Sequence, residues 1–299
     1  MVARTSRSFL SVGGAQGAPD EKKENRSHSI DGGADCWQHE WMLQIWPVEA
    51  FSDNYIWILE RRGSTRVTVV DPGDAAPVLA ALDERGLEVG AILITHHHGD
   101  HVGGLQEMIR RFHPSVFGSS TESVDGVDHP IADGDVVTLS DLGLTFDVLA
   151  LPGHTSGHIG YAGNGLAFVG DTLFAGGCGR VFEGTMAQMH ASLSKLAALP
   201  PETKTYCAHE YTLANLRFAT AVEPGNTELA DRLAATETAR AENRPTVPST
   251  MGFELATNPF LRCSEPDVVA AAAAQAGHDL EPGAEVFGAV RRWKDGWSG

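Results

Sequence analysis

The sequence has few cysteines, few basic side chains and no long apolar run, and each shortage excludes a class of protein. Its 299 residues include four cysteines, and none forms a Cys-x-x-Cys pair. They are typical of reduced intracellular thiols rather than of a disulfide framework, so we expect a cytoplasmic protein. The net charge of −17 disfavours a nucleic-acid-binding surface, which is usually basic. No apolar run approaches the roughly 20 residues of a membrane span, so we expect no membrane partner.

Three segments differ in composition. Residues 1–41 are rich in Gly, Ser and mixed charge with few apolar clusters, which predicts a disordered N-terminal extension. Met42 opens the first strand-like run and is our expected start of the fold. Over residues 42–211, short apolar strand-like runs alternate with helical patterns, as in a mixed α/β domain. Residues 212–299 are predicted to be helical, with helices over 212–222, 226–242, 265–276 and 282–295.

Four short apolar runs in the α/β part lead into a potential metal ligand. Loops at strand ends commonly carry functional groups, and strand ends from distant parts of a chain can converge on one edge of a sheet. The predicted strands are 91–94, 144–151, 166–169 and 204–208, and the residues that follow them are His96, His154, Asp171 and His209.

The segment Thr95-His96-His97-His98-Gly99-Asp100-His101 concentrates ligands suited to a divalent metal such as zinc. His96 and His98 are two apart, so in an extended segment they project to one face and can share an ion. A turn at Gly99 would let Asp100 and His101 face a second ion. A chance His-rich tract is the alternative reading, and the position after a buried strand argues against it.

Other acidic and histidine residues complete the expected site. His154 and His209 can each complete one set of ligands, and the Asp171 carboxylate can bridge two ions about 3.5–4 Å apart. His97 is expected to point elsewhere, and His158 to support the ligands rather than bind metal. Asp71 either orients a ligand imidazole or forms a turn before Pro72; the sequence favours neither.

These motifs resemble a known family. Residues 95–101 match the His-x-His-x-Asp-His signature of the metallo-β-lactamase superfamily. Several further segments resemble glyoxalase II, the hydroxyacylglutathione hydrolases, and the resemblance spans about residues 42–295. Those segments are PGHTSGH (152–158), GDTLFAGGCGR (170–180), AHEYT (208–212), EPGN (223–226), TVPST (246–250), NPF (258–260) and RRWK (291–294).

The resemblance implies an α/β fold, an αββα sandwich over residues 42–211 followed by a helical substrate-binding domain over residues 212–299. It implies two divalent metal ions, zinc being expected and iron or manganese the alternatives. It also implies hydrolysis of S-D-lactoylglutathione to D-lactate and glutathione, the second step of methylglyoxal detoxification, with Asp100 orienting a metal-bound hydroxide. The implied ligands are His96, His98 and His154 for one ion, Asp100, His101 and His209 for the other, and Asp171 between them.

The resemblance also implies the residues that contact glutathione. Arg180, Tyr211, Arg291 and Lys294 match such positions, although a solvated helix end is the alternative reading of the last two. Phe182 stands where some members have Tyr, and Arg180 where some have Lys, which puts affinity and thiol preference in question but not the chemistry. We expect a monomer.

Three rival functions fit parts of the pattern. A glutathione-persulfide dioxygenase-like mono-iron enzyme shares the superfamily signature, but the helical tail and the full ligand set argue against it. A β-lactamase or a metal-dependent nuclease is disfavoured by the same tail, and the nuclease also by the acidic charge. A non-catalytic metal-binding module would be indicated by a missing ligand, and no ligand is missing.

Overall fold

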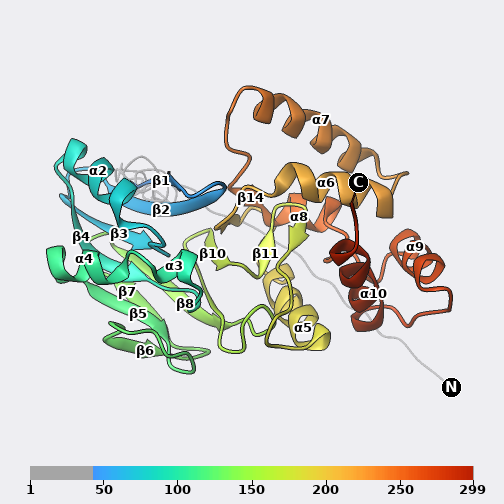
Figure 1. The fold of residues 1–299 in the computed structure, drawn as a ribbon, viewed down its shortest axis with the longest axis horizontal. Coiled ribbons are helices and arrows are strands. Elements are labelled where there is room, and N and C mark those ends of the chain that lie inside the picture. Colours follow the sequence, from blue (N-terminus) through green and yellow to red (C-terminus); the bar gives the residue numbers. More distant parts are fainter. Residues whose placement is uncertain (1–42, 299) are drawn as a thin grey trace, which may run out of the picture. The chain divides into compact units, whose positions relative to one another are not determined.

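The fold of residues 43–298, described here from a computed structural model, is built on two six-stranded sheets (Figure 1). Residues 1–42 and 299 are not described, so the expected extension over residues 1–41 and the expected start at Met42 lie outside the described residues. The first sheet has the order β1-β2-β3-β4-β5-β6, antiparallel among its first three strands and parallel from β3 onward. Its strands are β1 (Leu43–Ala50), β2 (Asn54–Arg61), β3 (Arg66–Val70), β4 (Glu88–Leu93), β5 (Ser115–Ser119) and β6 (His129–Ile131).

The second sheet has the order β14-β13-β10-β9-β8-β7 and is antiparallel except where β10 pairs with β13. A separate two-stranded hairpin, β11 (Leu173–Phe174) with β12 (Gly177–Cys178), follows β10. The strands of the second sheet are β7 (Val136–Leu139), β8 (Leu144–Ala150), β9 (Ile159–Gly163), β10 (Leu166–Gly170), β13 (Lys204–Cys207) and β14 (Ser249–Thr250).

Strand β2 shows how the first sheet separates two cores. Successive side chains of a strand point to opposite faces. Tyr55, Trp57 and Leu59 therefore join the core shared with the second sheet. Ile56 and Ile58 join the other core, which is completed by helices α2 (Ala75–Arg85) and α4 (Leu105–Phe112). The first sheet is thus covered by helices on one face and by the second sheet on the other.

Aromatic rings fill the space between the sheets. Trp57 of the first sheet meets Tyr206 of the second edge to face, with ring centroids 4.9 Å apart, and its indole N–H donates to the carbonyl of Cys207 at 2.8 Å. Helix α5 (Met186–Ala197) begins with a capping box at Thr185 and buries Leu193 and Leu196 in the same core. The expected αββα layering is confirmed.

The C-terminal part is helical, as predicted, and lies at the orange and red end of the chain in Figure 1. Asn226 caps α7 (Thr227–Ala241) by accepting from the Leu229 amide, and Pro266 occupies the first turn of α9 (Pro266–Ala276). No helix within residues 43–298 is long and apolar enough to cross a membrane. The helices are α6 (Thr212–Val222), α7 (Thr227–Ala241), α8 (Met251–Thr257), α9 (Pro266–Ala276) and α10 (Ala284–Asp295).

Several short elements were not predicted from the sequence. Strand β9 is buried on both faces and contains two glycines, so it shows neither alternation nor strong strand propensity. The hairpin strands β11 and β12 are two residues long, which is too short for any periodic signal. The other unpredicted elements are β5, β6, β14, α8 and the one-turn helix α3 (Gly99–Val102), where the sequence predicted only a turn at Gly99.

Candidate metal centre

Four strands deliver the expected ligands to one place. Strand β4 leads into His96, His98 and the short helix α3 (Gly99–Val102), which carries Asp100 and His101. His154 follows β8, Asp171 follows β10 and His209 follows β13. Strand β4 belongs to the first sheet and the other three to the second, so the site forms where corresponding edges of the two sheets meet.

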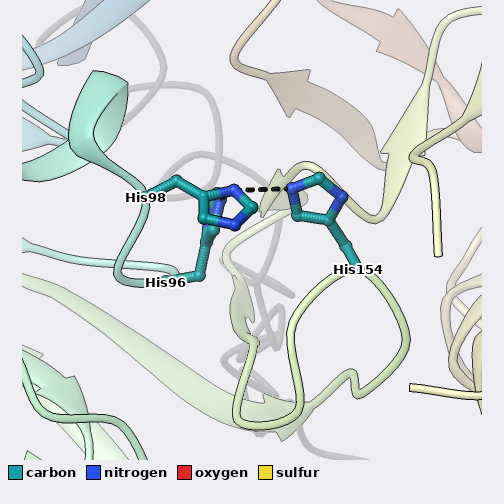
Figure 2. A group of neighbouring side chains, drawn as sticks. All are labelled: His96, His98 and His154. Carbon is teal, nitrogen blue, oxygen red and sulfur yellow. Dashed lines mark hydrogen bonds between the residues drawn. The ribbon is translucent and has the colours of Figure 1, made fainter. Parts of the chain in front are cut away.

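The first cluster contains His96, His98 and His154, whose donor atoms lie within 4.8 Å of one another. Nδ1 of His98 lies 3.1 Å from Nε2 of His96 and 3.0 Å from Nε2 of His154. Figure 2 shows the rings of His98 and His154 turned toward one another from separate loops. The i, i+2 spacing of His96 and His98 therefore places both rings beside a histidine that is more than fifty residues away.

The second cluster contains Asp100, His101 and His209. Nε2 of His209 and Nε2 of His101 lie 3.4 Å and 3.6 Å from Oδ2 of Asp100. Asp171 lies between the clusters. Its Oδ1 is 3.4 Å from Nε2 of both His101 and His209, and its Oδ2 is 3.4 Å from Nε2 of His154. One carboxylate oxygen thus faces each cluster, which is the arrangement of a bridging ligand.

These residues fit two divalent metal ions. Metal–nitrogen bonds of about 2.0–2.1 Å in a tetrahedral site require neighbouring donors roughly 3.3–3.4 Å apart. The donor separations of 3.0–3.6 Å agree with that requirement. In addition, Nε2 of His101 and Oδ1 of Asp171 are buried and have no hydrogen-bond partner. Buried polar atoms are almost always paired, so two orphaned ligand atoms facing one another indicate a site for a cation.

The electrostatics of the two clusters differ. Burial lowers the pKa of His96 and of His154, so both are neutral and ready to coordinate. Burial also acts to lower the pKa of His209, but hydrogen bonds to Asp100 and Asp171 outweigh it and raise the pKa to about 10. The hydrogen bond from His209 holds the pKa of Asp100 well below its usual range. In the absence of a cation the acids therefore keep His209 protonated, and metal binding there must release a proton.

In three of the proposed ligand histidines, the Nδ1 atom that does not face the cluster lies within hydrogen-bonding distance of an oxygen atom. Nδ1 of His101 lies 3.0 Å from Oδ2 of Asp71, a buried carboxylate that also accepts from the amide and hydroxyl of Thr95. Nδ1 of His209 lies 2.8 Å from Oδ1 of Asp53, and Nδ1 of His154 lies 2.8 Å from the carbonyl of Arg180. Such partners fix the tautomer and ring orientation of metal-ligating histidines.

Histidines outside the two clusters have structural partners. His158 is fully buried and accepts from the Asp171 amide through Nε2 at 3.1 Å. Burial lowers its pKa to about 3, so the ring is neutral. His97 belongs to neither cluster. Its ring pairs with Glu122 at 3.0 Å and Glu183 at 3.2 Å, and it forms a separate group of potential ligands with His98 and Glu183.

Sequence reasoning missed two residues at the end of the β1–β2 turn, Asp53 in the turn and Asn54 at the start of β2. Asp53 holds His209, and the Asn54 amide donates to Oδ2 of Asp100 at 3.1 Å. Neither residue stands in a motif, so only their position in space identifies them. Asp100 also borders an open cavity of about 560 Å³ lined in part by Phe51 and Glu107, and its carboxylate is 41% exposed. Asp100 is therefore accessible from solvent, whereas Asp171 is not.

Three of the expected substrate residues surround the ligands. The exposed Phe182 ring lies 5.3 Å from the ring of His154 and 6.0 Å from that of His98. Tyr211 is partly exposed and stacks on His209 with its ring centroid at 4.8 Å. Arg180 is exposed and pairs with Asp295 at 3.4 Å.

The remaining pair lies on α10. Arg291 is 4% exposed, and its guanidinium donates to the Cys178 carbonyl at 2.9 Å and to Asp295 at 3.0 Å. Lys294 is more accessible and donates to the Ala214 carbonyl at 3.2 Å. Burial and the nearby charge of Arg291 lower the pKa of Lys294 to about 8. An acid therefore lies among the residues expected to contact glutathione, because Asp295 pairs with both Arg180 and Arg291.

Two family models match the chain. The model described as the metallo-β-lactamase superfamily matches residues 51–209, which include every proposed ligand. The model described as hydroxyacylglutathione hydrolase C-terminus matches residues 210–297. Together they cover most of the described residues.

The chain is also similar to individual proteins, both in sequence and in fold. The chain is 53% identical over 249 residues to a hydroxyacylglutathione hydrolase of Halorhodospira halophila, covering 83% of this chain and 97% of that protein. Among solved structures, ETHE1 from Myxococcus xanthus superposes with a TM-score of 0.57 at 23% identity, over 85% of this chain and 98% of that chain. TTHA1623 in a di-iron-bound form superposes with a TM-score of 0.51 at 26% identity, over 72% of this chain and all of that chain.

Proposed function

The chain belongs to the hydroxyacylglutathione hydrolase family of the metallo-β-lactamase superfamily, and we propose that it hydrolyses S-D-lactoylglutathione and related S-2-hydroxyacylglutathiones. The products are the free 2-hydroxy acid and glutathione. One observation supports this above all others. Two clusters of three ligands lie on either side of a single carboxylate, Asp171, in a chain whose C-terminal part matches the hydroxyacylglutathione hydrolases.

We propose zinc as the metal in both positions, because the ligands are imidazole nitrogens and carboxylate oxygens, which are donors that zinc takes in proteins. His96, His98 and His154 would hold one ion, Asp100, His101 and His209 the other, and Asp171 both. When bound, the ions supply Lewis-acid chemistry that lowers the pKa of water to about 7 and polarises a carbonyl oxygen. The di-iron form of TTHA1623 makes iron the first alternative to test.

Asp100 is the residue proposed to orient the attacking water. Its side chain is 41% exposed and borders the open cavity, and the hydrogen bond from His209 holds its pKa well below the usual range. It is therefore an ionised acceptor for a water proton at neutral pH. The Asn54 amide holds Oδ2 of Asp100 in place, which limits the orientations that the carboxylate can adopt.

The thioester itself explains why no separate general acid is required. Water adds to the carbonyl carbon, the C–S bond breaks, and the sulfur leaves with the bonding electron pair. A thiol has a pKa of roughly 8.5, so its thiolate departs near neutral pH without being protonated first. Cys178 and Cys207 are buried, and burial raises their pKa to about 11 and about 12 respectively, which argues against a cysteine nucleophile.

Glutathione is proposed to bind on the side of the site formed by Arg180, Tyr211 and Lys294. Its two carboxylates require positive charge, which this otherwise acidic chain provides locally at Arg180 and Lys294. Arg291 lies beneath this surface and would add charge rather than an exposed hydrogen bond. Phe182 offers an apolar wall next to His98 and His154.

We further propose a catalytic domain over residues 42–211, a substrate-binding domain over residues 212–299, and a cytoplasmic monomer. All proposed ligands come from one chain, so the site requires no second copy. Cys178, Cys207 and Cys263 are free thiols, as is usual in a reducing compartment.

The test is thiol release from S-D-lactoylglutathione by purified, zinc-loaded protein, followed with a thiol reagent and matched by D-lactate formation. We expect both products in equal amounts, loss of turnover after chelation, and recovery when zinc is returned. No thiol release by fully metallated protein would refute the proposal. Oxygen uptake with glutathione persulfide in place of thioester cleavage would instead indicate the mono-iron alternative.

A further inference from the structure

The hairpin β11–β12 lies in the chain between Asp171, the proposed bridging ligand, and Arg180, whose carbonyl holds the proposed ligand His154. It begins two residues after Asp171 and ends two residues before Arg180. Residues 173–178 are all buried. A hairpin with strands of two residues satisfies few of its own main-chain groups, and buried main-chain groups need partners.

Side chains from the C-terminal helical part supply those partners. Five consecutive hairpin residues, 174–178, each form a main-chain hydrogen bond with one of four side chains. Asn258 Nδ2 donates to the carbonyls of Gly177 at 2.9 Å and Phe174 at 3.3 Å. Asn215 Nδ2 donates to the Ala175 carbonyl at 3.2 Å, and Arg291 donates to the Cys178 carbonyl at 2.9 Å. In the opposite direction, the Gly176 amide donates to the Glu254 carboxylate at 2.9 Å.

Glu254 anchors this arrangement. Its carboxylate is fully buried, and a buried charge is tolerated only when it is paired and hydrogen-bonded. Both oxygens are satisfied, one by Arg232 and Ser249, the other by the Gly176 amide and by Asn258 at 3.0 Å. A fully connected buried network of this kind rigidifies the segment it binds.

The residues that follow the hairpin contact groups next to the proposed metal ligands. Beyond Cys178, the Gly179 amide donates to the Thr172 carbonyl at 3.2 Å, and the next residue holds Nδ1 of His154 at 2.8 Å. Space here is tight, because a Cβ on Gly179 would lie 1.9 Å from the Asp171 carbonyl oxygen and 3.2 Å from Nδ1 of His154. Because Arg180 follows the hairpin directly in the chain, displacement of the hairpin is expected to shift the carbonyl that holds the His154 ring.

We propose that Asn258 and Glu254, with Asn215, are positioning residues that hold the β11–β12 hairpin and thereby fix the orientation of His154 in its metal site. The helical part thus contributes to metal retention as well as to substrate binding. This inference rests on the proposed role of His154 as a metal ligand.

The experiment compares Asn258→Ala with a matched control, Glu223→Gln. Glu223 is also a buried acid of the helical part, and it is held by two hydrogen bonds from Arg262 at 2.8 and 2.9 Å, but it does not bond to the hairpin. The full-length zinc-loaded proteins are titrated with a chromophoric chelator, and amide exchange is measured over the hairpin. Asn258→Ala should bind one of its two ions more weakly by up to about 10-fold, the low end of the range for losing a direct outer partner, because Asn258 acts on His154 only through the hairpin. It should also lose exchange protection over residues 173–182.

Asn215→Ala removes a single hairpin bond and should weaken one ion by a smaller factor. It decides the question if Asn258→Ala fails to fold. Wild-type zinc affinity in either folded variant would overturn the inference, as would equal metal loss in Glu223→Gln. The titration uses no thioester. A wild-type protein that binds two ions without hydrolysing would therefore overturn the proposed function and leave this inference standing.

Discussion

Removing the Asp53 carboxylate should weaken the second metal site. Asp53 is the outer partner of His209, with Oδ1 2.8 Å from Nδ1, and its side chain is 32% exposed. It stands outside every sequence motif discussed above. If its role is to orient His209, the effect must appear as weaker metal binding rather than as weaker folding.

The size of the effect follows from the kind of hydrogen bond. Bonds to charged groups contribute about 1.5–3 kcal/mol, against about 0.5–1.5 kcal/mol for neutral pairs. Asp53→Asn keeps an oxygen that can accept from Nδ1, so it should cost about 1 kcal/mol, roughly a fivefold loss. Asp53→Ala loses the whole bond. Because the carboxylate is partly solvated, we expect the lower part of the 10–100-fold range typical for outer partners.

Zinc affinity, measured by chelator competition, and kcat/KM for the thioester test this expectation. Asp141→Asn is the matched control, because Asp141 is a surface acid paired with Arg66 at 3.3 Å and is not among the ligands or their partners. The expected order of affinity is wild type and Asp141→Asn, then Asp53→Asn, then Asp53→Ala. Zinc affinity of Asp53→Ala within twofold of wild type would refute the orienting role.

Two further predictions concern the bridging ligand and the substrate surface. Asp171→Ala removes the carboxylate that faces both clusters at 3.4 Å, so metal affinity should fall by more than the roughly 100-fold caused by losing an outer partner. Metal analysis after gel filtration should therefore show loss of metal, and activity should fall with it. Unchanged metal content and rate would exclude bridging. Lys294, whose pKa is lowered to about 8, is charged below that pH and neutral above it, so KM for the thioester should rise as the pH passes upward through 8. Lys294→Arg should flatten that rise, and an equal rise in both proteins would show that another group is responsible.

Much of the fold and of the donor set could be predicted from local pattern. The segment 95–101 brings four expected ligands of two residue types together within seven residues, and His154, Asp171 and His209 each follow a short apolar run. Such signals are local, because strand runs and i, i+2 spacing depend on neighbours in the chain. The mixed α/β part and the C-terminal helices are predicted for the same reason, whereas the αββα layering is implied only by the family resemblance. Two-residue strands such as β11 and β12 carry no periodicity and were missed.

The sequence by itself therefore determined which chemical groups are available and that they follow strand ends. Only the tertiary structure decided how those groups are supported. Asp53 is 156 residues from His209, and Asn258 is 81 residues from Gly177, so neither partnership leaves a local pattern. The partner of His154 is a main-chain carbonyl, which every residue type possesses. Burial likewise placed Arg291 beneath the surface while leaving Lys294 more accessible, because exposure depends on what packs against a helix and not on its spacing.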